Sequence, residues 1–376
     1  MKILYTATVL SHICQFHLPH MKHLQEQDWE VHVAAHDNLA VKNGLQLKYC
    51  DKFIETPFSR SPKNPDNLKA YQQLKKLLGE EHYDAILCNT PMGGIVTRLA
   101  ARNTRKQGAK VIYMAHGFHF YKGSSKKAWL VFYPIEKYMA KHCDLLITIN
   151  KEDYALALEK FSKRTKVAHI HGVGVDENRY HPAAPEEQLA MRQTEGLSPA
   201  DFVILCTGEL NENKNQKTLI AAAALLKDKI PNLKVLLAGN GPMEQTLREQ
   251  IRTEGLGSIV KLLGYRTDLE KLVPAVDLVV SCSKREGMPL NIIEAMLCKK
   301  TVVASHNRGH NELVDDRCTG FLVDADDSAA FASAIQVSLD ADRSAIGEAG
   351  RQKASPYTVQ AVRETLHKLI LSILAD

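Results

Sequence analysis

Short apolar segments alternate with longer segments of helical periodicity, and this alternation constrains the fold more than any other feature. In the first half, six apolar segments predict buried strands, at residues 2–7, 30–35, 84–89, 110–115, 145–149 and 167–171. Helical patterns fall between them, at residues 16–27, 66–79, 93–107, 127–142 and 151–161. Strands that alternate with helices indicate βαβ units, in which helices cover both faces of a parallel sheet.

The alternation restarts after residues 177–188 (ENRYHPAAPEEQ), which contain two prolines and no apolar period, as is typical of a linker. Beyond it, strands are expected at 202–207, 234–238, 259–263, 277–281, 301–304 and 321–323. Helices are expected near 215–229, 242–254, 268–275, 289–298 and 328–340. The final segment predicts an amphipathic helix with one apolar side, made of Val359, Val362, Leu366, Leu369 and Ile373.

A chain of 376 residues is too long for one ordinary core. We therefore expect an α/β protein made of two doubly wound Rossmann-like domains facing a central cleft. Ligands of such sheets bind beyond the carboxyl ends of the strands.

Composition limits the class of protein. At 45% hydrophobic and 24% charged residues the chain resembles soluble globular proteins, and no apolar run reaches the ~18 residues of a membrane helix. The N-terminus lacks the features of a signal peptide, and the eight cysteines form no C-x-x-C pair, which predicts reduced thiols. We expect a cytoplasmic protein.

Charge is unevenly distributed. Residues 1–180 hold 26 Lys and Arg against 17 Asp and Glu, whereas residues 181–376 hold 22 against 26. This asymmetry suggests an anionic surface or substrate near the first half. A solvated basic face without a partner fits equally well.

The segment SKREGMPLNIIEAMLC, residues 283–298, places Glu286 and Glu294 at the ends of a mostly apolar stretch. It follows a predicted strand, and Pro289 suits the first position of a helix. The backbone N–H groups of residues 287–290 and the helix dipole would favour a phosphate. Glu294 could accept both hydrogen bonds of a ribose diol, and Glu286 could meet sugar hydroxyls on the other side. Two solvated carboxylates are the alternative.

This spacing resembles the E-x7-E element of retaining glycosyltransferases of the GT-B fold, family 4. The resemblance spans nearly the whole chain and is closest to the branch that builds bacterial exopolysaccharide and capsule. The matching stretches, in order, are AHGFHFYKG at 115–123, YPIEKYMAKHCDLLITINKEDY at 133–154, GVGVD at 172–176, GELNENKNQ at 208–216, AGNGP at 238–242 and RGHNELV at 308–314.

The resemblance implies a domain organisation and a reaction. Residues 1–180 would form an acceptor-side domain, with a C-terminal helix at 356–376 packing back on it, and residues 181–355 a domain that binds the donor. The activity implied is transfer of a sugar, with retention of configuration, from a nucleotide sugar to a glycan or lipid-linked acceptor, with a UDP-sugar as the expected donor. A UDP-sugar 2-epimerase of the same fold and a non-catalytic nucleotide-sugar-binding partner of another transferase remain alternatives.

Site residues follow from the same resemblance. The catalytic residues would be His116, Lys214 and Glu286. The donor would contact Gly208, Glu209, Asn213, Gly239, Gly241, Tyr265, Arg266, Gly287, Met288, Pro289, Leu290 and Glu294. Many members carry Arg where this chain has Glu209, so a second cationic phosphate contact would have to come from Arg285 or Arg266. For Arg266, an exposed turn in which Asp268 caps the next helix remains an alternative.

The acceptor side is assigned to His12, His17, Gly117 and His119. This chain lacks the glycine pair that is common there in relatives. The four histidines at 12, 17, 20 and 23 have no acidic or cysteine ligand at a zinc-like spacing. The pairs Asp324–Asp326 and Asp340–Asp342 are assigned to helix capping. We expect no metal, no other cofactor and no nucleic acid partner.

Residues 124–142 (SSKKAWLVFYPIEKYMAKH) mix lysines with aromatic and aliphatic side chains. A basic amphipathic helix could lie on the anionic inner face of the cell membrane, close to a lipid-linked acceptor. Packing of the same aromatic residues into the core is the alternative.

Overall fold

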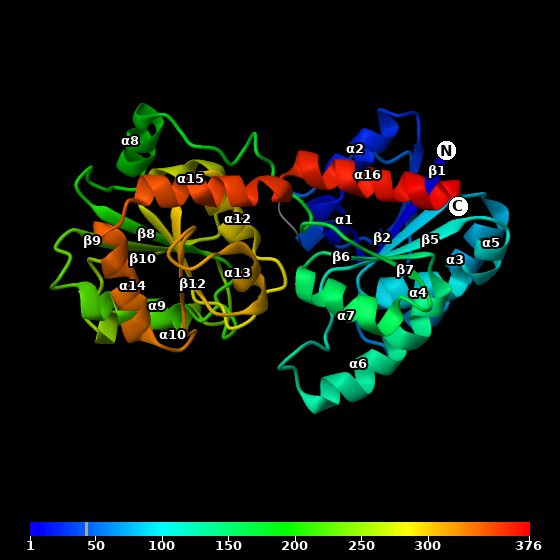
Figure 1. The fold of residues 1–376 in the computed structure, drawn as a ribbon, viewed down its shortest axis with the longest axis horizontal. Helices are drawn as coiled ribbons and strands as arrows, with labels where there is room; N and C mark the ends of the chain where they lie inside the picture. Colours follow the sequence, from blue (N-terminus) through cyan, green and yellow to red (C-terminus); the bar gives the residue numbers. More distant parts are fainter. Residues whose placement is uncertain (42–43) are drawn as a thin grey trace. The chain divides into compact units, whose positions relative to one another are not determined.

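The computed structural model describes residues 1–41 and 44–376, and they form two compact units, shown in Figure 1. The first unit comprises residues 1–174 and 359–376, and the second comprises residues 175–358. The limits expected from the sequence, at residues 180 and 355, lie within a few residues of these. The backbone N–H of Val175 donates to the carbonyl of Tyr357 at 2.9 Å, which joins the two ends of the second unit.

The first unit contains a parallel seven-stranded sheet of order β3-β2-β1-β4-β5-β6-β7. Its strands are β1 (Lys2–Val9), β2 (Glu30–His36), β3 (Lys52–Glu55), β4 (Ala85–Asn89), β5 (Lys110–Ala115), β6 (Leu145–Thr148) and β7 (Lys166–His169). Its helices are α1 (Leu10–Phe16), α2 (Leu18–Gln25), α3 (Asp66–Glu80), α4 (Pro91–Ala100), α5 (Arg102–Lys106), α6 (Lys126–Met139), α7 (Lys151–Phe161) and α16 (Val359–Ala375), with short 3₁₀ turns at Leu39–Val41 and Ala140–His142.

The second unit contains a parallel six-stranded sheet of order β10-β9-β8-β11-β12-β13. Its strands are β8 (Phe202–Thr207), β9 (Leu233–Ala238), β10 (Val260–Gly264), β11 (Leu278–Ser281), β12 (Thr301–Ser305) and β13 (Phe321–Val323). Its helices are α8 (Pro185–Thr194), α9 (Gln216–Leu226), α10 (Glu244–Thr253), α11 (Leu269–Ala275), α12 (Leu290–Leu297), α13 (Arg308–Leu313), α14 (Ser328–Asp340) and α15 (Arg343–Ala354), with a 3₁₀ turn at Ser355–Tyr357.

The strands at the centre of the second sheet are continuous apolar segments. Every residue of β8 (FVILCT) and of β11 (LVVS) is buried, as expected of strands covered by helices on both faces. Parallel pairing aligns Leu278 with Ile204 and with Thr301, so the carboxyl ends of β8, β11 and β12 share one edge of the sheet. The expected α/β class and doubly wound architecture are confirmed.

Several elements differ from the sequence-based expectations. The edge strand β3 (KFIE) was not expected, because it is mostly exposed and has no apolar run. The expected linker at 177–188 overlaps the start of α8, whose first residue is Pro185 and whose side chains are mostly polar. The short helix α13 and the polar helix α15 were also missed. The helix expected at 16–27 is the shorter α2, and α1, which precedes it and ends at Phe16, was not expected.

The C-terminal helix α16 belongs to the first unit, where it packs beside α2. Its buried residues are Val362, Leu366, Ile370 and Ile373, so Ile370 takes the place expected for Leu369. The rings of His23 and His367 meet edge to face at 4.8 Å.

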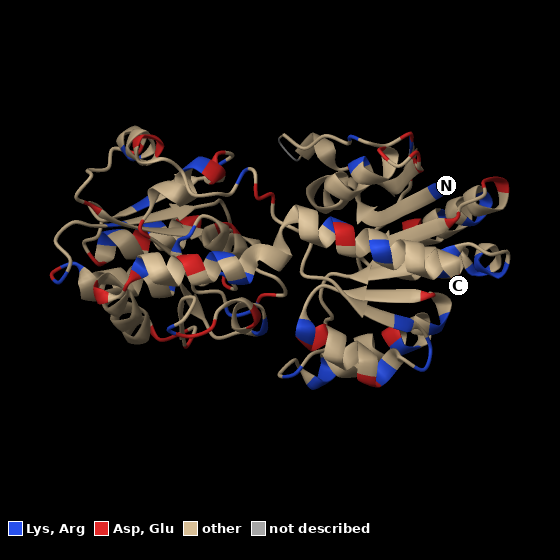
Figure 2. Ribbon diagram, turned by 45° about the horizontal axis from the view of Figure 1, so that its top comes forward, with Lys and Arg blue, Asp and Glu red and all other residues tan. Residues whose placement is uncertain are grey.

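Charged residues are spread over both units, and most of the thiols are buried. Figure 2 shows Lys and Arg interspersed with Asp and Glu over each unit rather than gathered on one side. All eight cysteines are free, and six of them are buried. Among the described residues, no helix has the length and apolar character needed to cross a membrane.

Candidate functional site

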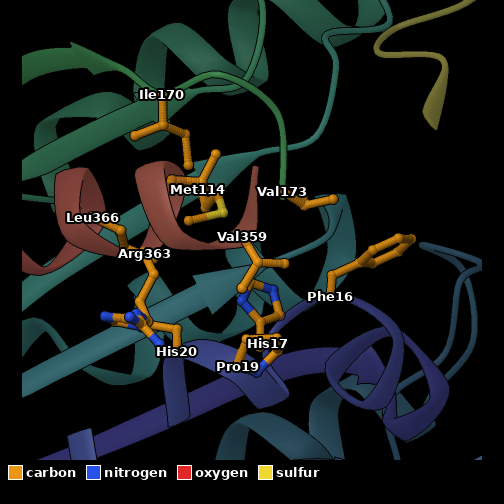
Figure 3. A pocket seen from close by; sticks show the side chains of 11 residues that line it. Phe16, His17, Pro19, His20, Met114, Ile170, Val173, Val359, Arg363 and Leu366 are labelled. Carbon is orange, nitrogen blue, oxygen red and sulfur yellow. The ribbon is translucent and has the colours of Figure 1, made fainter. Parts of the chain in front are cut away.

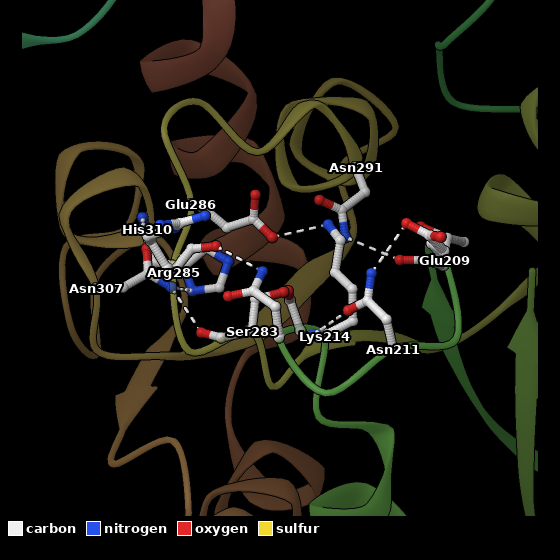
Figure 4. A network of polar contacts seen from close by, with 12 residues as sticks. Glu209, Asn211, Lys214, Ser283, Arg285, Glu286, Asn291, Asn307 and His310 are labelled. Atoms are coloured by element: carbon white, nitrogen blue, oxygen red, sulfur yellow. Dashed lines mark hydrogen bonds and ion pairs between the residues drawn. The ribbon is translucent and has the colours of Figure 1, made fainter. Parts of the chain in front are cut away.

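A polar cluster occupies the carboxyl edge of the second sheet (Figure 4). Lys214 lies in the loop between β8 and α9, and Glu286 lies in the loop between β11 and α12. The Nζ of Lys214 donates to Oε1 of Glu286 at 2.7 Å. The two residues expected to act on the donor therefore meet across a sequence separation of 72 positions.

The loop that carries Lys214 is braced by its own side chains. The amide of Asn211 accepts from the backbone N–H of Lys214 at 2.9 Å and donates to Glu209 at 2.9 Å. Asn213 donates to the carbonyl of Arg285 at 3.0 Å, which ties this loop to the loop of Glu286. Glu209 thus acts on Lys214 indirectly, through Asn211.

Glycines allow these loops to approach one another. A Cβ at Gly239 would lie 1.9 Å from the carbonyl oxygen of Gly208, and a Cβ at Gly241 would lie 2.3 Å from that of Leu210. Gly208 has φ +139° and lies against the aliphatic stem of Lys214. Gly208, Gly239 and Gly241 therefore serve close backbone packing beside the lysine.

The helix after Glu286 begins one residue later than expected. Pro289 is the N-cap of α12, with φ −81° and ψ 97°, rather than its first helical residue. Gly287 and Met288 precede the cap, and Leu290 is the first residue of the helix. The N–H of Ile292 already donates to the carbonyl of Pro289 at 3.1 Å, so the N–H groups left for a ligand are those that precede it at the helix end. The end remains suited to an anion.

Glu294 lies on α12 and is partly buried. Burial raises the pKa of its carboxyl from 4.5 to about 7, although a hydrogen bond with Tyr180 and the charge of Arg179 oppose this increase. At neutral pH this carboxyl is therefore poised between its protonated and ionised forms.

Arg266 is already paired. Its guanidinium contacts Glu195 at 2.6 Å and the carboxylate of Asp268 at 2.7 and 2.8 Å. Within the described residues, Asp268 stands at the N-cap of α11 but makes no side-chain capping bond, so the alternative in which its side chain caps this helix is wrong. Tyr265 beside it is 66% exposed. Arg285 is also exposed and lies in the same loop as Glu286.

Sequence reasoning missed His310 and Asn307. Asn307 caps α13 by accepting from the N–H of His310, and its amide donates to Ser283 at 2.8 Å. His310 Nδ1 lies 2.7 Å from the carbonyl of Ser305, and burial lowers the pKa of this imidazole to about 4. Within the described residues, its buried Nε2 has no hydrogen-bond partner. The stretch RGHNELV carried a signal, since Asn stands one residue before it in a capping position.

Histidines gather in the first unit at the carboxyl ends of β1 and β5. The Nε2 atoms of His12 and His116 are 3.2 Å apart, and His116 Nε2 lies 3.1 Å from the amide oxygen of Asn89. Burial lowers the pKa of His12 to about 4 and that of His116 well below its usual range. His12, His17 and His116 each bring a ring nitrogen within 4.8 Å of the others, so these neutral imidazoles could hold a metal ion.

His17 is buried beneath α16. Figure 3 shows it beside a small cavity with His20, Met114 and Arg363. This cavity has a volume of about 20 Å³, which is close to the size of one water molecule and too small for a substrate. Unlike His12, Gly117 and His119, His17 does not line the larger cavity of the unit.

That larger cavity has a volume of about 670 Å³. It extends from the end of β1 and the start of α1 to α6, and His119 stacks on Phe132 of α6 with ring centroids 4.7 Å apart. Three of the four acceptor-side candidates therefore line the same cavity.

The Asp pairs behave differently from one another. Asp342 caps α15 by accepting from Ser344 and Ala345 at 3.1 and 3.0 Å, as expected. Asp327, rather than Asp324 or Asp326, caps α14. Asp326 instead pairs with Lys284 at 2.8 Å.

Comparison with known proteins adds two family matches. Residues 187–353 match the model described as "Glycosyl transferases group 1", and residues 2–150 match "Glycosyl transferase 4-like". The chain is 44% identical over 337 residues to a Bacillus subtilis protein named "Putative glycosyltransferase EpsD", covering 89% of this chain and 86% of the relative.

Two further proteins are similar. The chain is 29% identical over 272 residues to an Escherichia coli UDP-Gal:alpha-D-GlcNAc-diphosphoundecaprenol alpha-1,3-galactosyltransferase, covering 72% of this chain and 70% of that enzyme. The crystal structure of HepE from Anabaena in complex with UDP superposes with a TM-score of 0.79 at 25% identity, covering 99% of this chain and 100% of that one.

Proposed function

The chain belongs to the family 4-like glycosyltransferases of GT-B fold, and we propose that it transfers a sugar from a UDP-linked donor to a lipid-linked glycan. Membership of this family favours transfer over epimerisation and over a purely binding role. The observation that carries the proposal is the contact of Lys214 with Glu286 at the edge where β8 and β11 end. This edge is where parallel sheets bind their ligands.

The donor would lie on the second unit. Its diphosphate would meet the Nζ of Lys214 and the N-terminus of α12, two groups that favour negative charge. Glu294 would accept hydrogen bonds from the ribose hydroxyls once its carboxyl is ionised. The complex of HepE with UDP supports the choice of uridine. Arg266 is held by Glu195 and Asp268, so Arg285 is the better candidate for a second phosphate contact.

Transfer would proceed with retention and without a metal. Negative charge grows on the departing diphosphate oxygen, where Lys214 and the α12 N-terminus stabilise it. Glu286 would hold sugar hydroxyls while the acceptor attacks from the leaving-group face. The assignment of His116 to the donor sugar rests on the family resemblance alone.

The acceptor would be a glycan on a lipid carrier, in exopolysaccharide or capsule assembly at the inner face of the membrane. The Escherichia coli relative is named for a diphosphoundecaprenol substrate, which supports this choice. The exposed apolar residues of α6 lie among lysines, as on helices that dock on anionic membranes.

A thermal-shift panel tests the proposal. UDP, GDP, ADP and NAD are each added at about 100 times the dissociation constant, with and without EDTA, where a ligand should add ~2.7 kcal/mol of stability. A shift with UDP alone, unchanged by EDTA, is expected. A shift with NAD and with no sugar-carrying nucleotide would refute donor binding, and loss of the UDP shift in EDTA would refute metal independence.

A further inference from the structure

The larger cavity of the first unit has walls of two chemical kinds. Polar side chains come from α1 and from the segment after β3, and include Ser11, His12 and Arg60. Apolar side chains come from α4, from the segment after β5 and from α6, and include Met92, Ile95, Phe118, Val131, Phe132 and Ile135. Its volume of about 670 Å³ falls within the roughly 300–1,000 Å³ of small-molecule sites. Such a lining suits an amphipathic ligand.

The apolar wall continues to the surface of α6. Val131, Phe132 and Ile135 line the cavity and are also 45%, 39% and 40% exposed. Leu130 beside them is 77% exposed. Exposed apolar groups rimmed by polar residues mark surfaces that meet a ligand, partner or membrane. A long apolar chain could therefore pass from a lipid surface at α6 into the cavity without crossing a polar barrier.

The inner wall is held in place by a buried ion pair. Arg98 of α4 donates to Glu136 of α6 at 2.8 Å, and its guanidinium lies 3.9 Å from the ring centroid of Tyr113. A Cβ at Gly94 would lie 2.4 Å from that ring on the α4 side. Tyr113 is thus fixed between α4 and the ion pair. The cavity is preformed, which lowers the entropic cost of filling it.

The polar wall carries a cation. Arg60 is exposed and lies close enough to His12 to lower the pKa of that imidazole. A guanidinium can bind phosphate oxygens through two parallel hydrogen bonds. The neutral side chains of Ser11 and His12 beside it add hydrogen-bonding groups without adding negative charge.

We propose that this cavity binds the lipid diphosphate portion of the acceptor, with the apolar chain between Ile95 and Phe132 and the diphosphate at Arg60. This inference rests on the proposed function for the nature of the acceptor, and it specifies where the carrier lipid is recognised. A lipid recognised inside the first unit would make the carrier, and not the glycan alone, a determinant of specificity.

Titration calorimetry on the full chain tests the inference, with farnesyl diphosphate as the probe and inorganic pyrophosphate as its head group alone. Farnesyl diphosphate is expected to bind at least tenfold more tightly than pyrophosphate. Ile95→Trp, which fills the apolar end, should remove this preference and leave pyrophosphate binding unchanged. Arg60→Ala should weaken both. Leu68→Trp, on the exposed face of α3, is the matched control and should change neither.

UDP is titrated into the same preparations to separate the two proposals. Equal binding of farnesyl diphosphate and pyrophosphate, or an undiminished preference in Ile95→Trp, overturns the lipid site even where UDP binds. Loss of UDP binding in Ile95→Trp would show a misfolded variant, and Phe132→Ala, expected to lose part of the preference, then decides. A preference that depends on Ile95 in a chain that fails to bind UDP would uphold the cavity and refute the donor assignment.

Discussion

Lys214 Nζ lies 2.7 Å from Glu286 Oε1, so two loops that end neighbouring strands are joined by an ion pair. The side chains are 22% and 13% exposed, and solvent screens their attraction only in part. Lys214, which is expected to bind the donor diphosphate, is therefore already paired with Glu286, the carboxylate that is expected to hold the sugar. Binding of a diphosphate would have to place Lys214 between two anions.

Glu286→Gln is expected to lower kcat by about 10²-fold or more and to leave the UDP dissociation constant within about threefold, because the amide still packs beside Lys214 but loses the charge that fixes the sugar. Lys214→Ala should weaken UDP binding by at least tenfold, since a charge-assisted hydrogen bond contributes about 1.5–3 kcal/mol. Donor turnover and UDP titration measure the two effects.

Glu212→Gln is the matched control for these variants. Glu212 lies in the same loop as Lys214, is exposed, and pairs only with Lys217 among the described residues, at 3.4 Å. Glu212→Gln should leave both kcat and the UDP dissociation constant unchanged. Wild-type turnover in Glu286→Gln would remove Glu286 from the site.

Most of the fold was predictable because its information is local. The strands β8, β11 and β12 are continuous apolar runs, and each was expected within a residue or so of its limits. The edge strand β3 and the polar helices α8 and α15 carry little apolar signal, since one side or more meets solvent. Periodicity cannot reveal such elements.

The sequence predicted which residues belong to the candidate site, but not which of their side chains contact one another. The contacts of Arg266 with Glu195 and of Lys214 with Glu286 join residues about 70 positions apart, and only the folded chain brings them together. The same reason explains why His310 was missed. Its neutral imidazole is recognisable only from its burial and from its bond to Ser305.

Glu294 should make stability depend on pH. Its pKa is about 7 in the folded chain against 4.5 ordinarily, so the unfolded chain ionises first as pH rises. Its contribution to the free energy of unfolding should therefore fall between about pH 4.5 and pH 7 and stay constant outside this window. Chemical denaturation of the wild type and of Glu294→Gln at several pH values measures this. A difference between the two that does not change with pH would contradict the prediction.

UDP binding should release a proton from Glu294 near pH 7, because hydroxyl groups favour the ionised carboxylate as their acceptor. Calorimetric titrations in buffers with different ionisation enthalpies count that proton. Glu294→Gln should release fewer protons than the wild type. Equal release by both would exclude Glu294 as the ribose ligand.

Removing only one member of the buried ion pair Arg98–Glu136 should destabilise the fold more than removing both. Arg98→Met leaves the Glu136 carboxylate without its partner and should lower the free energy of unfolding by about 3–5 kcal/mol. Arg98→Met with Glu136→Leu should recover most of this loss, because neither charge remains buried. Urea denaturation checks both variants. Lys76→Ala, which breaks the exposed pair with Glu80, is the control and should cost less than about 1 kcal/mol.

Helix α6 should bind anionic membranes through both its lysines and its apolar residues. Lys126 and Lys127 begin the helix, and Leu130 and Val131 follow on its exposed surface. Each lysine near an anionic surface contributes about 1 kcal/mol. Replacing both with Ala should therefore weaken vesicle binding by about 2 kcal/mol, or roughly thirtyfold. Flotation with vesicles of anionic lipid, at low and high salt, measures the change.

Lys75→Ala with Lys76→Ala, on the exposed face of α3, is the matched control and should have a much smaller effect. Because the attraction is electrostatic, high salt should weaken wild-type binding more than binding of the α6 variant. Equal binding of the wild type to neutral and anionic vesicles would mean that the lysines of α6 do not direct the protein to the membrane.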